Sequence, residues 1–195
     1  MKYIYINIQK IKNKTLNTFY ENLNIVYKTK INKILTPQKR KQSIAGLMLL
    51  NILLNSEYNL NLNDLKINYN KCDKPYIKDK NIFFNISHSF DYVICAISDK
   101  EIGVDIEKIR NTNIKNIKWF ATPKEQEFIM KSKNINLNLF KLYTLKEAYF
   151  KMKGTNLNNL LNVEFDLKND KSDTKSFVHH TKKINDYIFS IIEKK

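Results

Sequence analysis

Residues 102–107 read Ile-Gly-Val-Asp-Ile-Glu, a stretch in which apolar and acidic side chains alternate. This period of two is typical of a β-strand with one face in a core. On such a strand Asp105 and Glu107 leave the same face, whereas Val104 and Ile106 point into the interior. Two neighbouring carboxylates repel each other, and a divalent metal ion between them commonly relieves that repulsion. The alternative is an exposed strand face that carries two acids without a ligand.

The chain has 195 residues, of which 43% are hydrophobic and 12% aromatic. This length suits one ordinary domain or two small ones that share an interface. The apolar content is enough to bury a sizeable core, so the composition excludes a disordered chain. The net charge of +15 favours a polyanionic partner: nucleic acid, an anionic membrane surface, a phosphorylated cofactor or an acidic protein. Because the lysines are spread along the chain, part of this charge is expected on a solvated surface.

Three features bear on the compartment. Cys72 and Cys95 lie in no metal-ligand spacing and indicate no disulfide framework. No apolar run approaches the ~18 residues of a membrane-spanning helix. The first residues alternate like a strand and lack the core of a signal peptide. We therefore expect a cytoplasmic protein without a membrane partner.

Two long helices are predicted. Thr36 and Pro37 supply an N-cap hydroxyl and a proline at the first helical position, for a helix that ends near Asn55. Apolar residues at spacings of three and four predict a second helix over about residues 136–153, ending at Gly154. Strands are expected at residues 2–8, 81–86, 92–98, 102–107, 163–167, 176–178 and 187–192, with a turn at residues 87–91.

An internal echo predicts a duplicated fold. Residues 91–100 and 186–195 share the pattern Asp-Tyr followed by apolar positions, 95 residues apart. This offset is about half of the chain, so we expect an α+β lobe at residues 1–100 and a similar one at residues 101–195. The alternative is two unrelated strands with the same apolar pattern.

Four further stretches occur in a fixed order. They are Lys74-Pro75, Asn-Ile-Ser-His-Ser at 85–89, Gly-Val-Asp-Ile-Glu at 103–107, and Lys-Glu-Ala-Tyr-Phe-Lys at 146–151 followed by Gly154. Phe-Ala-Thr-Pro-Lys-Glu at 120–125 fills the slot between the last two. In this order and spacing, residues 40–160 resemble the 4′-phosphopantetheinyl transferases of the surfactin-synthetase-activating type. The length is similar to that of the two-lobed, monomeric members.

The resemblance implies an α+β fold of two similar lobes with the active site in the cleft between them. It also implies a holo-[acyl-carrier-protein] synthase activity: the phosphopantetheine arm of coenzyme A moves to a serine of an apo carrier protein and adenosine 3′,5′-bisphosphate leaves. The expected partners are coenzyme A, Mg²⁺ and an acidic acyl or peptidyl carrier protein, which the charge of +15 would attract. The rival of a different class is a basic nucleic-acid-binding protein without catalysis.

The metal site follows from the same resemblance. Asp105, Glu107 and Glu147 are expected to bind Mg²⁺ together with substrate phosphates. Lys151 lies one helical turn after Glu147 and would meet the diphosphate. Glu147, or a metal-bound water beside it, would be the base for the serine hydroxyl, with Lys146 assisting. Without the resemblance, Glu147 and Lys151 would read as an ordinary surface pair.

The coenzyme A contacts are likewise implied by the family positions. His88, flanked by Ser87, would bind the 3′-phosphate, and Lys74-Pro75 would lie against the adenosine. Arg40 and Lys41 are candidates for a further 3′-phosphate contact.

Glu125 has two readings of equal weight. In the family a glutamate at this position lies near the metal site as a secondary contributor. A capping box with Thr122 explains the same residue.

Overall fold

The fold is given by a computed structural model, which describes residues 1–72, 74–77, 80–155, 160–168, 171–173 and 175–195. The first half contains β1 Lys2–Asn7, η1 Ile8–Lys10, α1 Asn13–Glu21, α2 Ile25–Asn32, α3 Pro37–Tyr58, η2 Leu62–Asp64, β2 Ile67–Tyr69, β3 Pro75–Ile77, β4 Phe83–Ser89 and β5 Tyr92–Ser98. The second half contains β6 Ile102–Lys108, η3 Ile114–Trp119, α4 Pro123–Lys131, α5 Ile135–Lys153, η4 Leu160–Asn162, β7 Lys171–Asp173, β8 Phe177–Ile184 and β9 Tyr187–Lys194. Within these described ranges, no helix has the length and apolar character needed to cross a membrane.

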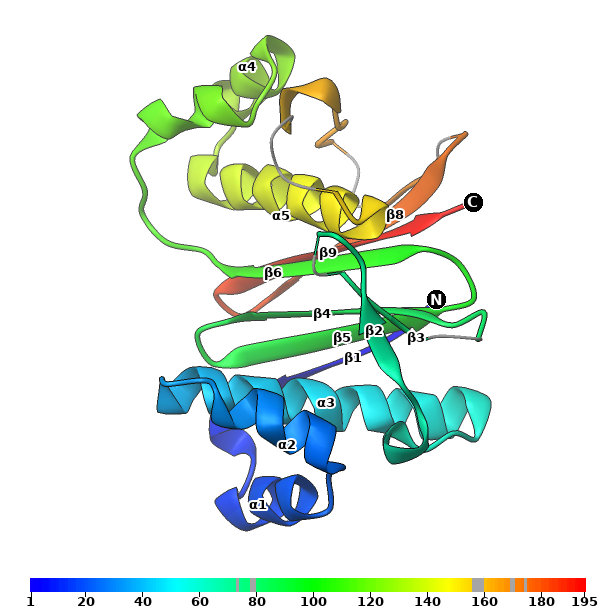
Figure 1. The fold of residues 1–195 in the computed structure, drawn as a ribbon. Coiled ribbons are helices and arrows are strands. Elements are labelled where there is room, and N and C mark those ends of the chain that lie inside the picture. The colour runs from blue at the N-terminus through cyan, green and yellow to red at the C-terminus, as the bar shows by residue number, and fades with distance from the viewer. Residues whose placement is uncertain (73, 78–79, 156–159, 169–170, 174) are drawn as a thin grey trace.

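Two antiparallel sheets and two long helices form four layers (Figure 1). The first sheet has the strand order β1-β5-β4, and the second has the order β6-β9-β8-β7. Helix α3 packs on the outer face of the first sheet, and α5 packs on the outer face of the second. The inner faces of the two sheets meet in a third cluster of buried apolar side chains. The repetition confirms the predicted α+β fold of two similar lobes.

Strand β5 is buried along its whole length because it lies between two cores. Successive side chains of a strand point to opposite faces. Positions 93, 95 and 97 therefore pack toward α3, and positions 92, 94 and 96 pack toward the second sheet. This placement explains why residues 92–97 form an unbroken apolar run.

The same hairpin occurs once in each lobe. Phe90-Asp91 joins β4 to β5, and Asn185-Asp186 joins β8 to β9. Phe90 and Asn185 both have left-handed backbones, with φ of 48° and 50°. The predicted turn at residues 87–91 was too long, because ladder pairing of β4 with β5 continues to the Ser89–Tyr92 pair. His88 therefore lies on a strand rather than in a turn.

Two other boundaries differ from expectation. Helix α3 runs to Tyr58 rather than ending near Asn55, and Asn59 closes it with a left-handed φ of 53°. Residues 163–167 form no strand. The backbone N–H of Phe165 instead donates to the side chain of Glu125 at 2.9 Å. This N–H is therefore bonded to a side chain and not to the backbone of a neighbouring strand.

Candidate active site

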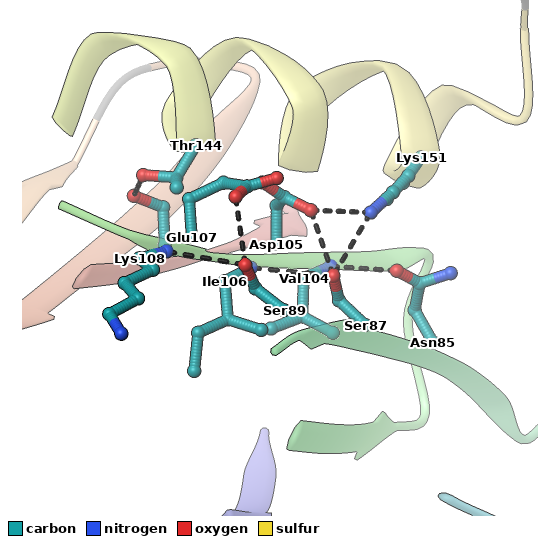
Figure 2. A network of polar contacts seen from close by, with 11 residues as sticks. Asn85, Ser87, Ser89, Val104, Asp105, Ile106, Glu107, Lys108, Thr144 and Lys151 are labelled. Atoms are coloured by element: carbon teal, nitrogen blue, oxygen red, sulfur yellow. Dashed lines mark hydrogen bonds and ion pairs between the residues drawn. The ribbon is translucent and has the colours of Figure 1, made fainter. Parts of the chain in front are cut away.

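The two lobes meet along strands β4 and β6, which are edge strands of different sheets. Side chains of β4 accept hydrogen bonds from alternate backbone N–H groups of β6, as Figure 2 shows. The pairs are Val104 N to Asn85 Oδ1 (2.9 Å), Ile106 N to Ser87 Oγ (3.4 Å) and Lys108 N to Ser89 Oγ (3.3 Å). This seam fixes the position of β6 relative to the first lobe and satisfies the N–H groups of an otherwise open edge.

Two acidic side chains leave β6 on the face that α5 covers. Asp105 is buried and Glu107 is partly buried. Ser87 donates to Asp105 Oδ1 at 2.8 Å, and Ser89 donates to Glu107 Oε2 at 2.9 Å (Figure 2). Ser87 and Ser89 therefore each accept a hydrogen bond from a backbone N–H of β6 and donate one to a carboxylate of the same strand.

Helix α5 adds Glu147 and Lys151 to the same place. These side chains line a pocket of about 250 Å³ together with Ile86, Ser87, His88, Asp105, Glu107 and Tyr143. The Lys151 ammonium lies 2.6 Å from Asp105 Oδ1 and donates to Ser87 Oγ at 3.2 Å. The structure thus brings together the four residues predicted to hold the metal and the diphosphate.

Gly103 lets α5 approach this closely. A Cβ on Gly103 would overlap the backbone carbonyl oxygen of Ala148 and the backbone nitrogen of Met152. Only glycine allows the helix to lie directly on β6 at this point. The glycine in the 103–107 stretch therefore sets the distance between Asp105 and the side chains of α5.

The acids of the pocket are short of positive charge. Burial raises the pKa of Glu147, and the neighbouring Asp105 raises it further. Burial also raises the pKa of Glu107, again with a contribution from Asp105. Tyr143 is hydrogen-bonded to Glu147, and burial together with that carboxylate raises the pKa of the phenol. Lys151 opposes both carboxylate shifts and Arg110 opposes that of Glu107, but both pKa values stay raised.

The donors in this pocket fit a hard divalent cation. Among the described residues, no group of three Asp, Glu, His or Cys side chains is already arranged as a metal site. However, Asp105 Oδ2 is buried and has no hydrogen-bond partner, which is costly for a carboxylate oxygen. Asp105, Glu107 and Glu147 offer only oxygen ligands, as Mg²⁺ prefers. These three residues are therefore the ones that could hold it.

A second hollow of about 360 Å³ adjoins the pocket and shares Ile86 and His88 with it. Its other lining residues are Ile34, Lys39, Gln42, Ser43, Leu47, Ile67, Tyr69, Pro75 and Phe84. Most of this wall is apolar, with Lys39 and His88 as its basic groups. The two spaces together offer an apolar slot beside a charged one.

Three predicted coenzyme A contacts lie elsewhere. Arg40 donates to the carbonyl of Ile34 at 3.0 Å, and Lys41 donates to the side chain of Asn13 at 3.4 Å. Neither lines the hollow, and their role as 3′-phosphate contacts stays a prediction. The amine of Lys74 is also absent from the hollow, because it donates to the Met152 carbonyl near the end of α5.

Lys39 is a basic residue of the hollow that the sequence analysis did not propose as a coenzyme A contact. It lines the hollow with Gln42, Ser43 and Leu47, which are three, four and eight positions further along α3. That spacing marks one face of a helix. Counting from the N-cap would have separated Lys39 from Arg40 and Lys41, which point to other faces.

His88 lies on β4, lines both spaces and is exposed. Surrounding protein still partly desolvates the imidazole and lowers its pKa, and the charges of Lys151 and Lys39 lower it further. An anion that accepted hydrogen bonds here would reverse this shift. Lys151 and Lys39 thus place two positive charges near His88, which would favour an anion there.

Sequence comparisons agree with this geometry. A family model described as the 4′-phosphopantetheinyl transferase superfamily matches residues 101–192, and one described as 4′-phosphopantetheinyl transferase, N-terminal, matches residues 11–100. The chain belongs to the 4′-phosphopantetheinyl transferase superfamily. Each lobe of the structure is thus matched by a separate family model of 4′-phosphopantetheinyl transferases.

Individual superfamily members are similar over part of their length. The 4′-phosphopantetheinyl transferase gsp of Aneurinibacillus migulanus is 35% identical over 115 residues, which are 58% of this chain and 48% of that protein. The 4′-phosphopantetheinyl transferase Sfp of Bacillus subtilis is 31% identical over 119 residues, which are 60% and 53%. The 4′-phosphopantetheinyl transferase HetI of a Nostoc species is 28% identical over 145 residues, which are 70% and 61%. The chain spans about half of the first two relatives.

In this superfamily member, Lys146 and Glu125 lie outside the pocket. They form an ion pair of 2.7 Å with side chains that are 0% and 1% exposed. Lys146 also donates to the Leu160 carbonyl at 2.8 Å, and Glu125 accepts the backbone N–H groups of Thr122 and Phe165. Neither a catalytic role for Lys146 nor a contact of Glu125 with the metal is supported by these positions, because both charges are already satisfied.

Proposed function

We propose that this chain transfers the phosphopantetheine arm of coenzyme A to a serine hydroxyl of an apo carrier protein. The observation that carries the proposal is the convergence of Asp105, Glu107, Glu147 and Lys151 from two elements of the chain. Beside them lies a hollow with an apolar wall and basic groups. The charged pocket suits a diphosphate, and the adjoining apolar hollow suits an adenosine.

Each part of coenzyme A has a candidate partner. The adenosine would lie against Pro75 in the apolar hollow. The 3′-phosphate would meet His88 and Lys39, which lie on facing elements, β4 and α3. The diphosphate would accept a hydrogen bond from Lys151 in the adjoining pocket. Charge-assisted bonds from three cations would orient the substrate.

The reaction replaces one phosphorus–oxygen bond by another. The serine oxygen attacks the phosphorus that carries the pantetheine arm, and the bond to adenosine 3′,5′-bisphosphate breaks. The proton of the hydroxyl would pass to the Glu147 carboxylate, whose pKa burial raises toward that of a more effective base. Mg²⁺ held by Asp105, Glu107 and Glu147 would supply positive charge for the leaving phosphate. Lys151 would hold that leaving group in place.

The proposal extends to the form in which the protein acts. Within one chain, β4 supplies Ser87 and His88 and the second lobe supplies the acids, so a monomer would be sufficient for the site. The site would lie in the cleft between lobes of residues 1–100 and 101–195. Cys72 and Cys95 are both free thiols, in keeping with a cytoplasmic location. An acidic carrier protein would be steered to a chain of net charge +15.

A mass measurement tests the activity. The purified chain is incubated with coenzyme A, Mg²⁺ and several apo carrier proteins from fatty-acid, polyketide and nonribosomal-peptide systems. We expect at least one carrier to gain the mass of one phosphopantetheine group, and the gain to need both coenzyme A and Mg²⁺. A folded chain that modifies none of the carriers would contradict the proposal. The preferred carrier identifies the pathway.

A further inference from the structure

Lys151 is paired with one of the three acids in the pocket, Asp105. Its ammonium is 2.6 Å from Asp105 Oδ1 and donates to Ser87 Oγ at 3.2 Å (Figure 2). Ser87 donates in turn to the same Asp105 oxygen at 2.8 Å. Lys151 is thus the counter-ion of the most deeply buried acid on β6.

The pair differs from a permanent structural ion pair in two ways. The other oxygen of Asp105 is buried without a hydrogen-bond partner, so the carboxylate is only half satisfied. The side chain of Lys151 is 30% exposed, whereas that of Asp105 is 5% exposed. The lysine can therefore turn to another anion, while the aspartate is fixed by the seam.

A divalent cation and this ammonium would compete for Asp105. Both are positive, so the arrival of one at the carboxylate disfavours the other. A cation that binds alone must displace Lys151 and leave it without an anion. A cation that binds together with a diphosphate leaves Lys151 with a new partner in the same pocket, beside His88.

We infer that Lys151 makes metal binding and diphosphate binding depend on each other. In the free protein it holds the place of the metal at Asp105 and so weakens the binding of metal alone. When coenzyme A enters, Lys151 moves to the diphosphate and vacates Asp105. By linkage, the metal must strengthen coenzyme A binding by the same factor. This inference rests on the proposed function for the identity of the anion.

Calorimetry on the full chain tests the competition. Mg²⁺ binding is measured alone and with saturating coenzyme A for the wild type and for Lys151→Met, with Lys151→Gln as a second neutral variant should the first fail to fold. We expect Mg²⁺ alone to bind the neutral variant about tenfold more tightly than the wild type. Coenzyme A alone should bind it more weakly, and the factor by which coenzyme A strengthens Mg²⁺ binding should be smaller.

Two control variants separate this role from a general effect of charge. Lys153 lies in the same last turn of α5, with its ammonium 5.7 Å from the centre of the Tyr149 ring. Lys153→Met removes the same charge without touching Asp105 and should leave Mg²⁺ binding close to that of the wild type. Lys151→Arg keeps the competing charge and should also bind Mg²⁺ alone like the wild type.

The outcomes distinguish the inference from the proposed function. If wild-type protein binds Mg²⁺ and coenzyme A but the folded neutral variant binds Mg²⁺ alone no more tightly, Lys151 does not compete and the inference is overturned. The transferase proposal would survive that result. If wild-type protein binds neither Mg²⁺ nor coenzyme A, the proposed function fails and the inference fails with it.

Discussion

Helix α5 carries two lysines whose ion pairs have almost the same length but different surroundings. Lys146 lies 2.7 Å from Glu125, and Lys151 lies 2.6 Å from Asp105. The first pair is sealed, with side chains 0% and 1% exposed. The second opens into a pocket, and one oxygen of its carboxylate has no partner.

The difference teaches that distance alone does not assign a role to an ion pair. Three backbone groups complete the hydrogen bonds of Lys146 and Glu125: the Leu160 carbonyl accepts from Lys146, and the N–H groups of Thr122 and Phe165 donate to Glu125. This pair ties α5 to α4 and to the segment before β7. Around Lys151 the hydrogen bonds are incomplete, which is the condition for an exchangeable contact.

The largest effect on transfer should come from a substitution on the side of α5 that faces the pocket. Glu147→Gln removes a ligand and a proton acceptor with almost no change of shape. We expect transfer to fall by about 10⁴-fold while the melting temperature stays near that of the wild type. Carrier modification followed by mass spectrometry measures the rate. Glu127→Gln, at an exposed position on α4, is the control and should transfer at the wild-type rate. Near-normal turnover of Glu147→Gln would exclude Glu147 as an essential metal ligand or base.

On the sealed side, substitution should act on stability instead. Lys146→Met leaves Glu125 as a buried charge without its cation and should lower the free energy of unfolding by about 3–5 kcal/mol. The double variant Lys146→Met/Glu125→Gln should recover part of that loss, because the buried charge is gone. Urea denaturation gives both values. The rate per folded molecule should stay close to that of the wild type; a folded Lys146→Met that transfers nothing would place Lys146 in the chemistry.

The third prediction concerns the close packing of α5 on β6 at Gly103, where a substitution should have a smaller effect on stability than Lys146→Met. Gly103→Ala drives a methyl group into the backbone of α5 and should lower the free energy of unfolding by about 1–3 kcal/mol, with a loss of transfer as Glu147 and Lys151 shift. Gly46→Ala is the matched variant on α3, where the new Cβ would meet side chains rather than backbone, with Ile86 nearest at 2.9 Å. Equal stability of the two variants would contradict the role given to Gly103.

The smallest effect concerns pH at the mouth of the pocket. Burial and two cations lower the pKa of His88 in the free protein, and a bound phosphate would raise it. Coenzyme A should therefore bind most tightly below the free-state pKa and lose up to about tenfold in affinity per pH unit as the pH rises toward the bound-state pKa. Calorimetry across this range measures the slope. His88→Gln should remove it, and an unchanged slope would exclude a titrating contact.

Much of this comparison was visible in the sequence, because it depends on local periodicity. The alternation in residues 102–107 placed Asp105 and Glu107 on one face, and the spacing of apolar residues located α5. The echo of residues 91–100 in 186–195 reflects two hairpins with the same turn geometry. The strand and helix patterns repeat every two or every three to four residues, so they can be read from the sequence without knowledge of spatial neighbours.

The remainder depends on packing across the chain. Helical spacing places Lys151 rather than Lys146 on the face of Glu147. The partner of each lysine, Glu125 for Lys146 and Asp105 for Lys151, is set by packing against other elements. The predicted strand at residues 163–167 failed because the side chain of Glu125 holds the Phe165 N–H. This hydrogen bond joins residues 40 positions apart in the chain, so no local sequence pattern predicts it.

The most direct test of the account is a crystal structure with coenzyme A and Mg²⁺ bound. We predict the metal among Asp105, Glu107 and Glu147, with Lys151 on the diphosphate and Lys146 still paired with Glu125. A metal bound elsewhere, or a Lys151 that remains on Asp105 beside bound coenzyme A, would contradict the distinction between the sealed and the exchangeable pair.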